Sequence, residues 1–124
     1  MIEDDDDEIF GYYLNNKVIE SYHEEMETDL ESFHFNLQSN GRLQGPMMFE
    51  IQDTRDGYEL FIANKPNLIS LGDIRLYKYS GIGSYCVQND WKFDYCGIEN
   101  ALCGTTIGFK LNFIPKRIIV IQMS

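Results

Sequence analysis

The clearest strand signal in the chain is the run KRIIVIQM at residues 116–123. Four β-branched residues in succession favour a pleated strand, because their restricted χ1 rotamers fit a sheet better than a helix. Alternate side chains point to opposite faces, and both faces are apolar: Ile119, Ile121 and Met123 on one, Ile118 and Val120 on the other. Since each face then needs a covering layer, the run predicts a central strand. Pro115 should mark its start, because proline is tolerated where a strand begins.

The rest of the chain is large enough for one domain, with 124 residues and a mass of 14.5 kDa. Its eight Tyr and eight Phe suit strands better than a helical bundle. No stretch of eighteen apolar residues occurs, which predicts that the chain has no membrane span. The amino terminus turns acidic directly after Ile2, the reverse of a secretion signal, so we expect the chain to stay inside the cell.

The cysteines support that expectation. Cys86, Cys96 and Cys103 are an odd number, and their spacings match neither a disulfide framework nor a zinc motif. Reduced thiols in the cytoplasm or the nucleus are therefore predicted. We interpret the three side chains first as small apolar groups that fill the core.

The formal net charge of -10 is unevenly distributed. Residues 1–31 hold twelve of the twenty acidic residues and only one base, Lys17, whereas the remainder is close to neutral. Binding to nucleic acid without sequence preference needs clustered Lys and Arg, which displace counterions from the phosphates. The sequence therefore predicts no nucleic-acid partner, and the acidic front end remains open to a basic protein partner.

The first third of the chain predicts an acidic start followed by a strand. Residues 1–8 include the run DDDDE, which is too charged to pack, so a disordered start is expected before a single domain at residues 9–124. IFGYYL at 9–14 predicts a strand, in which Gly11 permits a bulge or a close backbone approach. Within residues 17–31 a short amphipathic helix is predicted from the spacing of Ile19, Tyr22, Met26 and Leu30. Crowded acidic residues weaken that helix, and a loop is nearly as well supported.

Further strands follow at short intervals. SFHFNL at 32–37 predicts a half-buried antiparallel strand that places three apolar residues on one face, Phe33, Phe35 and Leu37, and three polar ones on the other, Ser32, His34 and Asn36. The runs at 47–51 and 58–62, with the turn sequence RDG between them, predict a hairpin. Strands are also predicted at 68–71, 74–79, 84–88 and 91–95, a spacing typical of a sandwich or barrel.

No motif in the sequence identifies a catalytic, cofactor-binding or metal-ligating residue. GIGSYC at 81–86 has two of the three glycines of a dinucleotide fingerprint and no helix pattern after it, which favours a hairpin turn. The run DDDDE lacks the spaced ligands and the central glycine of a calcium loop. His23 and His34 match no zinc pattern, and with three scattered cysteines they offer no closed tetrahedral set.

One chemical alternative stays open at this stage. Cys86 or Cys103 could form a nucleophilic pair with His34, but a sequence does not show whether the side chains lie close together. A redox sensor or an enzyme could also use any one of Cys86, Cys96 and Cys103. Either role requires a thiol with a lowered pKa and access to solvent.

The order of several short motifs resembles the TLDc domain family, from about residue 8 to residue 123. The early motifs are IFGYY at 9–13, ESFHFNL at 31–37, GYELFI at 57–62 and LGDIRL at 71–76. That family opens its core with a Phe-Gly-Gly-Tyr-like strand and continues with a Ser-Phe-Leu-Phe-like strand; here FGYY and SFHF stand in those places. The later segments, SYCVQ at 84–88, ENALCG at 99–104 and PKRIIVIQM at 115–123, are similar to divergent members found in protists.

The chain also departs from that family in three places. Members normally carry a further stretch before the Phe-Gly strand, so the resemblance implies a short member that lacks the family's N-terminal portion. Better-known members place a Glu and a Trp in the final strand, where this chain has IVIQM. The glycine-rich turn is reduced to LGD at residues 71–73. Such a short member could expose an unpaired sheet edge, and the chain could then be unstable or pair with another copy.

The resemblance implies a mainly β fold, a two-layer antiparallel β-sandwich with one or two short flanking helices. It implies no agreed active site, no cofactor and no metal, and it assigns a role to no residue. Better-known members are linked to protection from oxidative stress and to binding of the vacuolar proton-pumping ATPase. The leading expectation is therefore a non-enzymatic, cytoplasmic protein-binding module, and the alternative is the thiol-based sensor or enzyme.

Overall fold

The computed structural model describes residues 1–15, 25–27, 29–53, 58–62, 69–77, 83–103, 105–107 and 110–122. These residues form two antiparallel sheets, which confirms the predicted mainly β class. They contain no helix, and therefore none that could cross a membrane. Within the stretch predicted as a short helix, the described part includes strand β3, Glu25–Glu27. The flanking helices implied by the resemblance are thus absent from the described residues.

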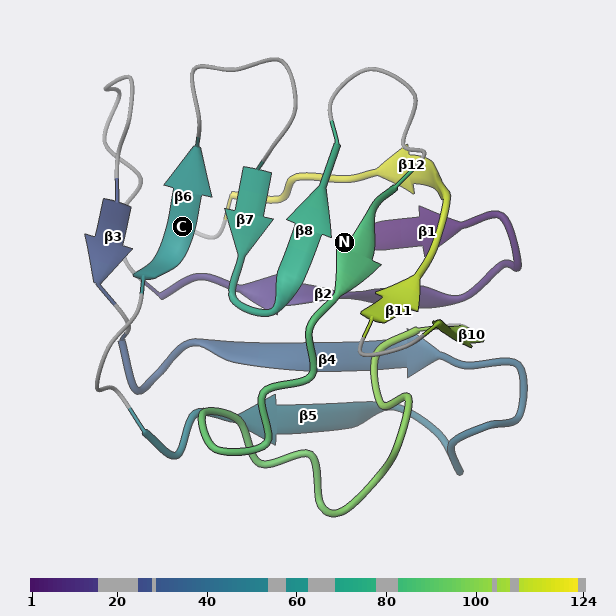
Figure 1. Ribbon diagram of the computed structural model, residues 1–124, viewed down its shortest axis with the longest axis horizontal. Helices are drawn as coiled ribbons and strands as arrows, with labels where there is room; N and C mark the ends of the chain where they lie inside the picture. The colour runs from purple at the N-terminus through teal and green to yellow at the C-terminus, as the bar shows by residue number, and fades with distance from the viewer. Residues whose placement is uncertain are drawn as a thin grey trace.

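Sheet A has five strands and sheet B has seven. The order in sheet A is β12-β1-β2-β4-β5, with bounds Pro115–Ile118, Ile2–Asp4, Ile9–Tyr13, Phe33–Gln38 and Met47–Glu50. The order in sheet B is β10-β11-β9-β8-β7-β6-β3; its strands other than β3 are Thr105–Ile107, Lys110–Asn112, Tyr85–Cys86, Ile74–Leu76, Ile69–Leu71 and Tyr58–Ile62. The strands at the middle of sheet B, such as β8 and β9, run across the strands of sheet A and pass in front of β2 (Figure 1). The two sheets therefore enclose an apolar layer between them.

The irregular segment 87–103 covers the part of sheet A that sheet B does not reach. It runs in front of β4 and β5 (Figure 1), and it is tied to the end of β5 by backbone bonds from Gln52 N–H to Lys92 O at 2.8 Å and from Asp94 N–H to Glu50 O at 2.9 Å. Apolar side chains of both layers are fully buried: Phe10 and Phe49 from sheet A, Ile74 from sheet B, and Phe93, Tyr95 and Leu102 from the segment. A strand was predicted at 91–95, but only an isolated bridge between Phe93 and Ile51 forms there.

The prediction that the C-terminal run forms a central strand is wrong. The strand begins at Pro115 as predicted, but β12 lies at the edge of sheet A and ends at Ile118. Among the described strands it pairs with β1 alone, and this pairing continues through bonds from the Met1 amine to Ile119 O at 2.6 Å and from Ile119 N–H to Met1 O at 2.8 Å. Beyond it, Val120 is 91 % exposed and Ile121 is 59 % exposed. Residue type favours a strand, but it does not determine which strand lies alongside.

The expected disordered start is also wrong. Ile2–Asp4 form strand β1, which lies between β12 and β2, and the side chains of Ile2 and Asp4 are buried. The Asp4 carboxylate accepts hydrogen bonds from the backbone N–H groups of Asp6 and Glu8, so it holds the turn that joins β1 to β2. The charge of the run is therefore placed on a tight loop and does not prevent a strand from forming.

The predicted hairpin between residues 47–51 and 58–62 does not form. Strand β5 is the edge of sheet A and pairs with β4, whereas β6 belongs to sheet B and pairs with β3 and β7. The chain thus passes from one layer to the other between these strands. Consecutive strands usually pair, but a turn sequence between two strands does not exclude a crossover to the other sheet.

The alternation predicted in β4 is correct, but the face that enters the core is the polar one. His34, Asn36 and Ser32 are at most 1 % exposed. Phe33 and Phe35 are half-buried on the opposite side of the sheet, and Leu37 is 44 % exposed. Sheet A therefore has an inner face with buried polar groups and an outer face that carries aromatic rings.

Candidate functional site

A buried polar centre lies where the inner face of sheet A meets the β7–β8 turn. Strand β4 carries His34 inward, and its Nε2 accepts a hydrogen bond of 2.9 Å from the backbone N–H of Asp73. The proton of the neutral ring is then on Nδ1, which lies 3.3 Å from the Gly11 carbonyl oxygen and donates to it. Burial lowers the pKa of His34 to about 3, so the ring is neutral at physiological pH. Both ring nitrogens are occupied by the backbone.

The Asp73 carboxylate connects the same turn to the segment 87–103. One oxygen accepts from the Asn89 side-chain amide at 2.7 Å, and the other accepts from the Asn89 backbone N–H at 2.8 Å and from the Tyr95 hydroxyl at 2.7 Å. Burial raises the pKa of the Asp73 carboxyl, and these hydrogen bonds act in the opposite direction. Burial also raises the pKa of Tyr95, and the neighbouring Asp73 adds to that rise. The phenol therefore remains a hydrogen-bond donor.

Gly72 allows this centre to close. It has a φ of +53°, a conformation that residues with a Cβ rarely adopt, and it occupies the first central position of the two-residue turn between β7 and β8. A Cβ at this position would lie 2.5 Å from Nε2 of His34 and 2.9 Å from a ring carbon of Tyr12. The short LGD segment in the sequence thus has a physical role, because only glycine allows the turn to approach the imidazole so closely.

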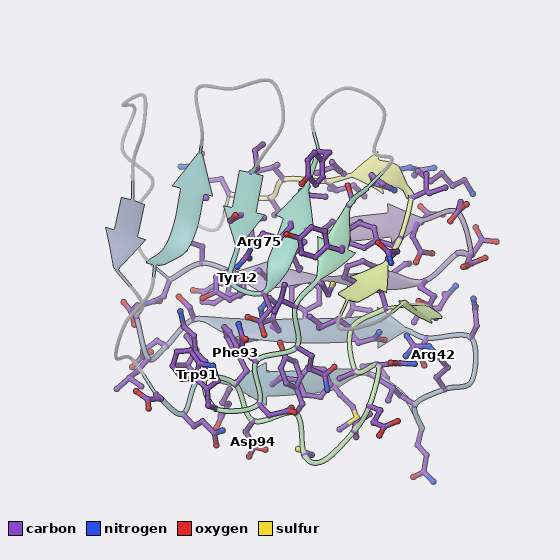
Figure 2. All side chains as sticks on the ribbon, viewed as in Figure 1. Tyr12, Arg42, Arg75, Trp91, Phe93 and Asp94 are labelled. Atoms are coloured by element: carbon purple, nitrogen blue, oxygen red, sulfur yellow. The ribbon has the colours of Figure 1, made fainter. Side chains whose placement is uncertain are left out.

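The geometry of the centre suits structural support better than a reaction. Its histidine has both nitrogens bonded, and both oxygens of its carboxylate accept from donors of the segment. Aromatic rings surround the imidazole: those of Tyr12, Phe93 and Tyr95 lie 4.7, 4.5 and 6.3 Å from its centroid. Tyr12 and Phe93 lie on the side of the molecule opposite to Arg42 (Figure 2). The centre joins sheet A, sheet B and segment 87–103.

The structure brings two of the three cysteines together. Cys86 of β9 and Cys103 are fully buried, and their Sγ atoms are 3.3 Å apart without a disulfide bond. Burial and the adjacent Cys103 raise the pKa of Cys86 well above its ordinary value. These two side chains fill the core as predicted, whereas Cys96 is exposed on segment 87–103. Because the nitrogens of His34 already bond Gly11 and Asp73, no nitrogen is left to activate a thiol.

The acidic run at the amino terminus is organised by neighbouring bases. Lys116 Nζ lies 3.0 Å from Asp7 Oδ1 and 3.5 Å from Glu3 Oε1, and Arg42 Nε lies 2.7 Å from Glu8 Oε1. Burial raises the pKa of Asp4 to about 6. No group of three His, Cys, Asp or Glu side chains that could hold a metal ion is found among the described residues. His23 lies outside them, as do residues 81 and 82 of the predicted turn.

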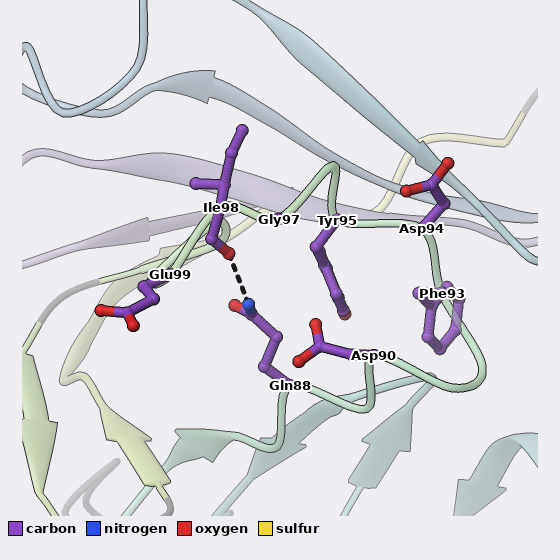
Figure 3. Close-up of a pocket in the computed structure, with 8 residues that line it drawn as sticks. All are labelled: Gln88, Asp90, Phe93, Asp94, Tyr95, Gly97, Ile98 and Glu99. Carbon is purple, nitrogen blue, oxygen red and sulfur yellow. Dashed lines mark hydrogen bonds between the residues drawn. The ribbon is translucent and has the colours of Figure 1, made fainter.

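A shallow pocket of about 300 Å³ lies on segment 87–103. The rings of Phe93 and Tyr95 and the side chain of Ile98 line it together with three carboxylates, those of Asp90, Asp94 and Glu99 (Figure 3). Gln88 donates to the Ile98 carbonyl oxygen at 2.6 Å and fixes one wall (Figure 3). Among the described residues that line it, none is a nucleophile with an adjacent base, so the pocket does not show the arrangement for nucleophilic catalysis.

A candidate binding surface lies on the outside of sheet A. We use the name outer apolar face for the side chains of Tyr13, Phe33, Phe35, Leu37 and Met48. The rings of Tyr13 and Phe33 are stacked with centroids 4.9 Å apart, and the Phe35 ring lies over Gly11, where a Cβ would be 2.7 Å from Cζ. Met48 is 51 % exposed and Leu37 is 44 % exposed. Apolar side chains from three neighbouring strands thus lie next to one another on one side of the sheet.

No family model matches the chain, and no curated protein or solved structure matches it. The TLDc resemblance therefore stays a prediction.

Neither the buried polar centre nor the outer apolar face was predicted from the sequence. Asp73, Asn89 and Tyr95 are up to 22 residues apart in sequence, and their contacts depend on how a turn and an irregular segment fold back. The useful signals were the Gly-Asp turn and the polar residues that alternate with Phe in β4. A buried role for those polar residues would have placed the Phe side chains outside.

Proposed function

We propose that the chain is a non-catalytic protein-interaction module that binds a partner through the outer apolar face. The observation that carries this proposal is the clustering of five apolar side chains from β2, β4 and β5 on one side of a sheet whose other side forms the core. Contiguous exposed apolar surface is characteristic of binding sites, and aromatic residues and Met are enriched there. The closed buried polar centre supports the non-catalytic part of the proposal.

The TLDc resemblance directs the search for a partner and a process. We propose a cytoplasmic location, the vacuolar proton-pumping ATPase as the first partner to test, and a role in protection from oxidative stress. These proposals derive from the motif order at residues 9–13, 31–37, 57–62 and 71–76, and from no contact in the structure. They extend the proposal of an interaction module, which depends on the outer apolar face alone.

The test uses two cross-linking positions of equal exposure. Met48 on the outer apolar face and Trp91 on segment 87–103 are each 51 % exposed. A photo-reactive p-benzoylphenylalanine is introduced at one or the other position, and the protein is irradiated in a cell extract. The proposal expects a product specific to position 48 that disappears when Phe33→Ser is added. Identical products from both positions, or none from position 48, would contradict it.

A second candidate function, a thiol-based redox sensor, is supported by the contact between Cys86 and Cys103. Hydrogen peroxide would convert the two thiols to a disulfide and would itself be reduced to two waters. The raised pKa of Cys86 predicts that this reaction is slow, because the thiolate is the reactive form. Treatment of the Cys96→Ser variant with peroxide, followed by alkylation and mass measurement of the unfolded chain, tests the idea. Two alkylated cysteines after prolonged oxidation would exclude it.

A further inference from the structure

The outer apolar face is ordered in rows across three strands. The register places Tyr13, Phe33 and Glu50 in one row and Gly11, Phe35 and Met48 in the next. Glu31 precedes Phe33 by two residues, and its side chain is exposed, as is that of Glu50. At the β12 side of the sheet, Glu3 is paired with Arg117 at 3.6 Å and with Lys116 at 3.5 Å. The row of Tyr13 and Phe33 therefore ends in the acidic side chain of Glu50, and Glu31 lies just before Phe33, whereas the other row ends in Met48 and the β12 side is charge-balanced.

The dimensions of the face match those of a helix. Strands β2, β4 and β5 are two inter-strand spacings wide, about 10 Å, which is close to the diameter of an α-helix with its side chains. From Phe33 to Leu37 the face extends about 14 Å, or roughly two and a half helical turns. An amphipathic helix presents an apolar stripe of this size, and packing of such a helix on a sheet face is a common way to complete a layer.

The charge of the chain indicates which helix would bind. A second copy of the chain carries the same net charge of -10, so the two copies repel each other as they approach. Like charges placed opposite each other at an interface oppose association. A helix that carries Lys or Arg beside its apolar stripe meets the carboxylates of Glu31 and Glu50 with favourable charge and is attracted by the field of the acidic chain.

We propose that the outer apolar face binds an amphipathic helix of a partner protein, with Lys or Arg residues positioned to meet Glu31 and Glu50. The apolar stripe of that helix covers Phe33, Phe35 and Met48, and the basic residues lie at the Phe33 end of the face. This inference rests on the proposed interaction function. It specifies the chemistry and secondary structure of the partner segment.

The test uses three synthetic peptides of about 18 residues, five helical turns each. The first has Leu on one helical side and Lys on the other, the second has Glu in place of each Lys, and the third is a scrambled version of the first without an apolar side. Each peptide is titrated into the full chain and followed by amide NMR shifts. We expect the basic amphipathic peptide to bind at least about tenfold more tightly than the other two, with shifts confined to β2, β4 and β5.

Variants of the chain test separately the apolar contact with the helix and the preference for a basic helix. Met48→Ser should weaken binding of the basic peptide by about tenfold, whereas Trp91→Ser, a change at equal exposure elsewhere, should leave it unchanged within about twofold. Glu31→Lys with Glu50→Lys should reduce the preference for the basic peptide over the acidic one by about tenfold. Melting curves show whether each variant is folded, and the shift map of the unmodified chain depends on no substitution.

Two results would overturn the inference. Equal binding of the scrambled peptide would mean that charge alone attracts it, and shifts that map to segment 87–103 would mean that another surface is used. The cross-linking experiment separates these failures from failure of the proposed function. If position 48 gives a cross-linked product that depends on Phe33, but the peptide experiment gives either of these two results, the interaction module is supported and the basic helix is excluded as its partner. If the cross-linked product from position 48 and the binding of the basic peptide are both absent, the interaction module is excluded as well.

Discussion

The two faces of sheet A do not follow the simplest interpretation of its sequence, in which apolar side chains face the core and polar ones face the solvent. The inner face carries His34, Asn36 and Asp4 among apolar side chains, all at most 1 % exposed. The outer face carries Phe33 and Phe35, which remain partly exposed. Burial in this sheet therefore does not follow hydrophobicity at each position. Each of these polar side chains has a backbone hydrogen-bond partner, from a distant segment for His34 and Asn36 and from the β1–β2 turn for Asp4, and these bonds offset part of the cost of burial.

A Phe→Ala substitution should lower the free energy of unfolding by very different amounts on the two faces, and this is the largest contrast that we expect. Phe49 of β5 points inward and is fully buried, so Phe49→Ala should lower the free energy of unfolding by about 3 to 5 kcal/mol through a cavity and lost contacts. Phe35→Ala on the outer apolar face removes a half-buried ring and should cost only about 1 kcal/mol. Urea denaturation of the two variants measures the contrast. Equal losses would show that the outer face is packed as tightly as the core.

The next contrast concerns the approach of the β7–β8 turn to the inner face. Gly72→Ala should cost more than about 2 kcal/mol, because the new Cβ would lie 2.5 Å from Nε2 of His34 at a φ of +53°. Gly41→Ala is the matched control, since Gly41 also has a positive φ, +85°, but a Cβ added there would meet no atom within 4 Å. That substitution should cost about 1 kcal/mol from backbone strain alone. Thermal unfolding measures both, and equal losses would contradict a close contact with the imidazole.

A smaller effect is expected from protonation of His34. Its pKa is lowered from 6.5 to about 3, so the unfolded chain binds a proton between these values and the folded chain does not. The contribution to stability is complete above pH 6.5 and is lost as the pH falls, with a slope of at most about 1.4 kcal/mol per pH unit. Asp4 acts in the opposite direction, because its pKa is raised to about 6 and its protonated form is favoured in the folded chain.

The two groups can be separated by urea denaturation across pH 4 to 7. His34→Gln should remove the part of the acid destabilisation that belongs to the histidine, although the variant is less stable overall. Asp4→Asn should make the acid destabilisation steeper, because it removes the opposing contribution of the carboxyl. Parallel curves for the unmodified chain and His34→Gln would show that the ring already binds its proton in the folded state.

Local features of the fold were predictable, and the choice of neighbours was not. The strand at residues 9–14, the alternation of 32–37 and the start at Pro115 were predicted correctly, because each depends on residue types that lie next to one another. The inner role of His34 depends on Gly11 and Asp73, and that of Asn36 depends on the Leu102 carbonyl, to which its amide donates at 2.8 Å. Such partners come from other segments, so a local pattern does not reveal them.

Substitutions at the C-terminal end should have the smallest effect on the free energy of unfolding, although the sequence predicted a large effect there. A central strand apolar on both faces would lose about 2 to 5 kcal/mol on truncation of one of its Ile side chains. Val120 and Ile121 are 91 % and 59 % exposed beyond the edge strand, so Val120→Ala and Ile121→Ala should each change the free energy of unfolding by less than about 0.5 kcal/mol. An apolar side chain contributes several kcal/mol to the free energy of unfolding only when it is enclosed. A decrease above about 2 kcal/mol in urea denaturation would therefore show that this strand is central and that a layer covers both of its faces.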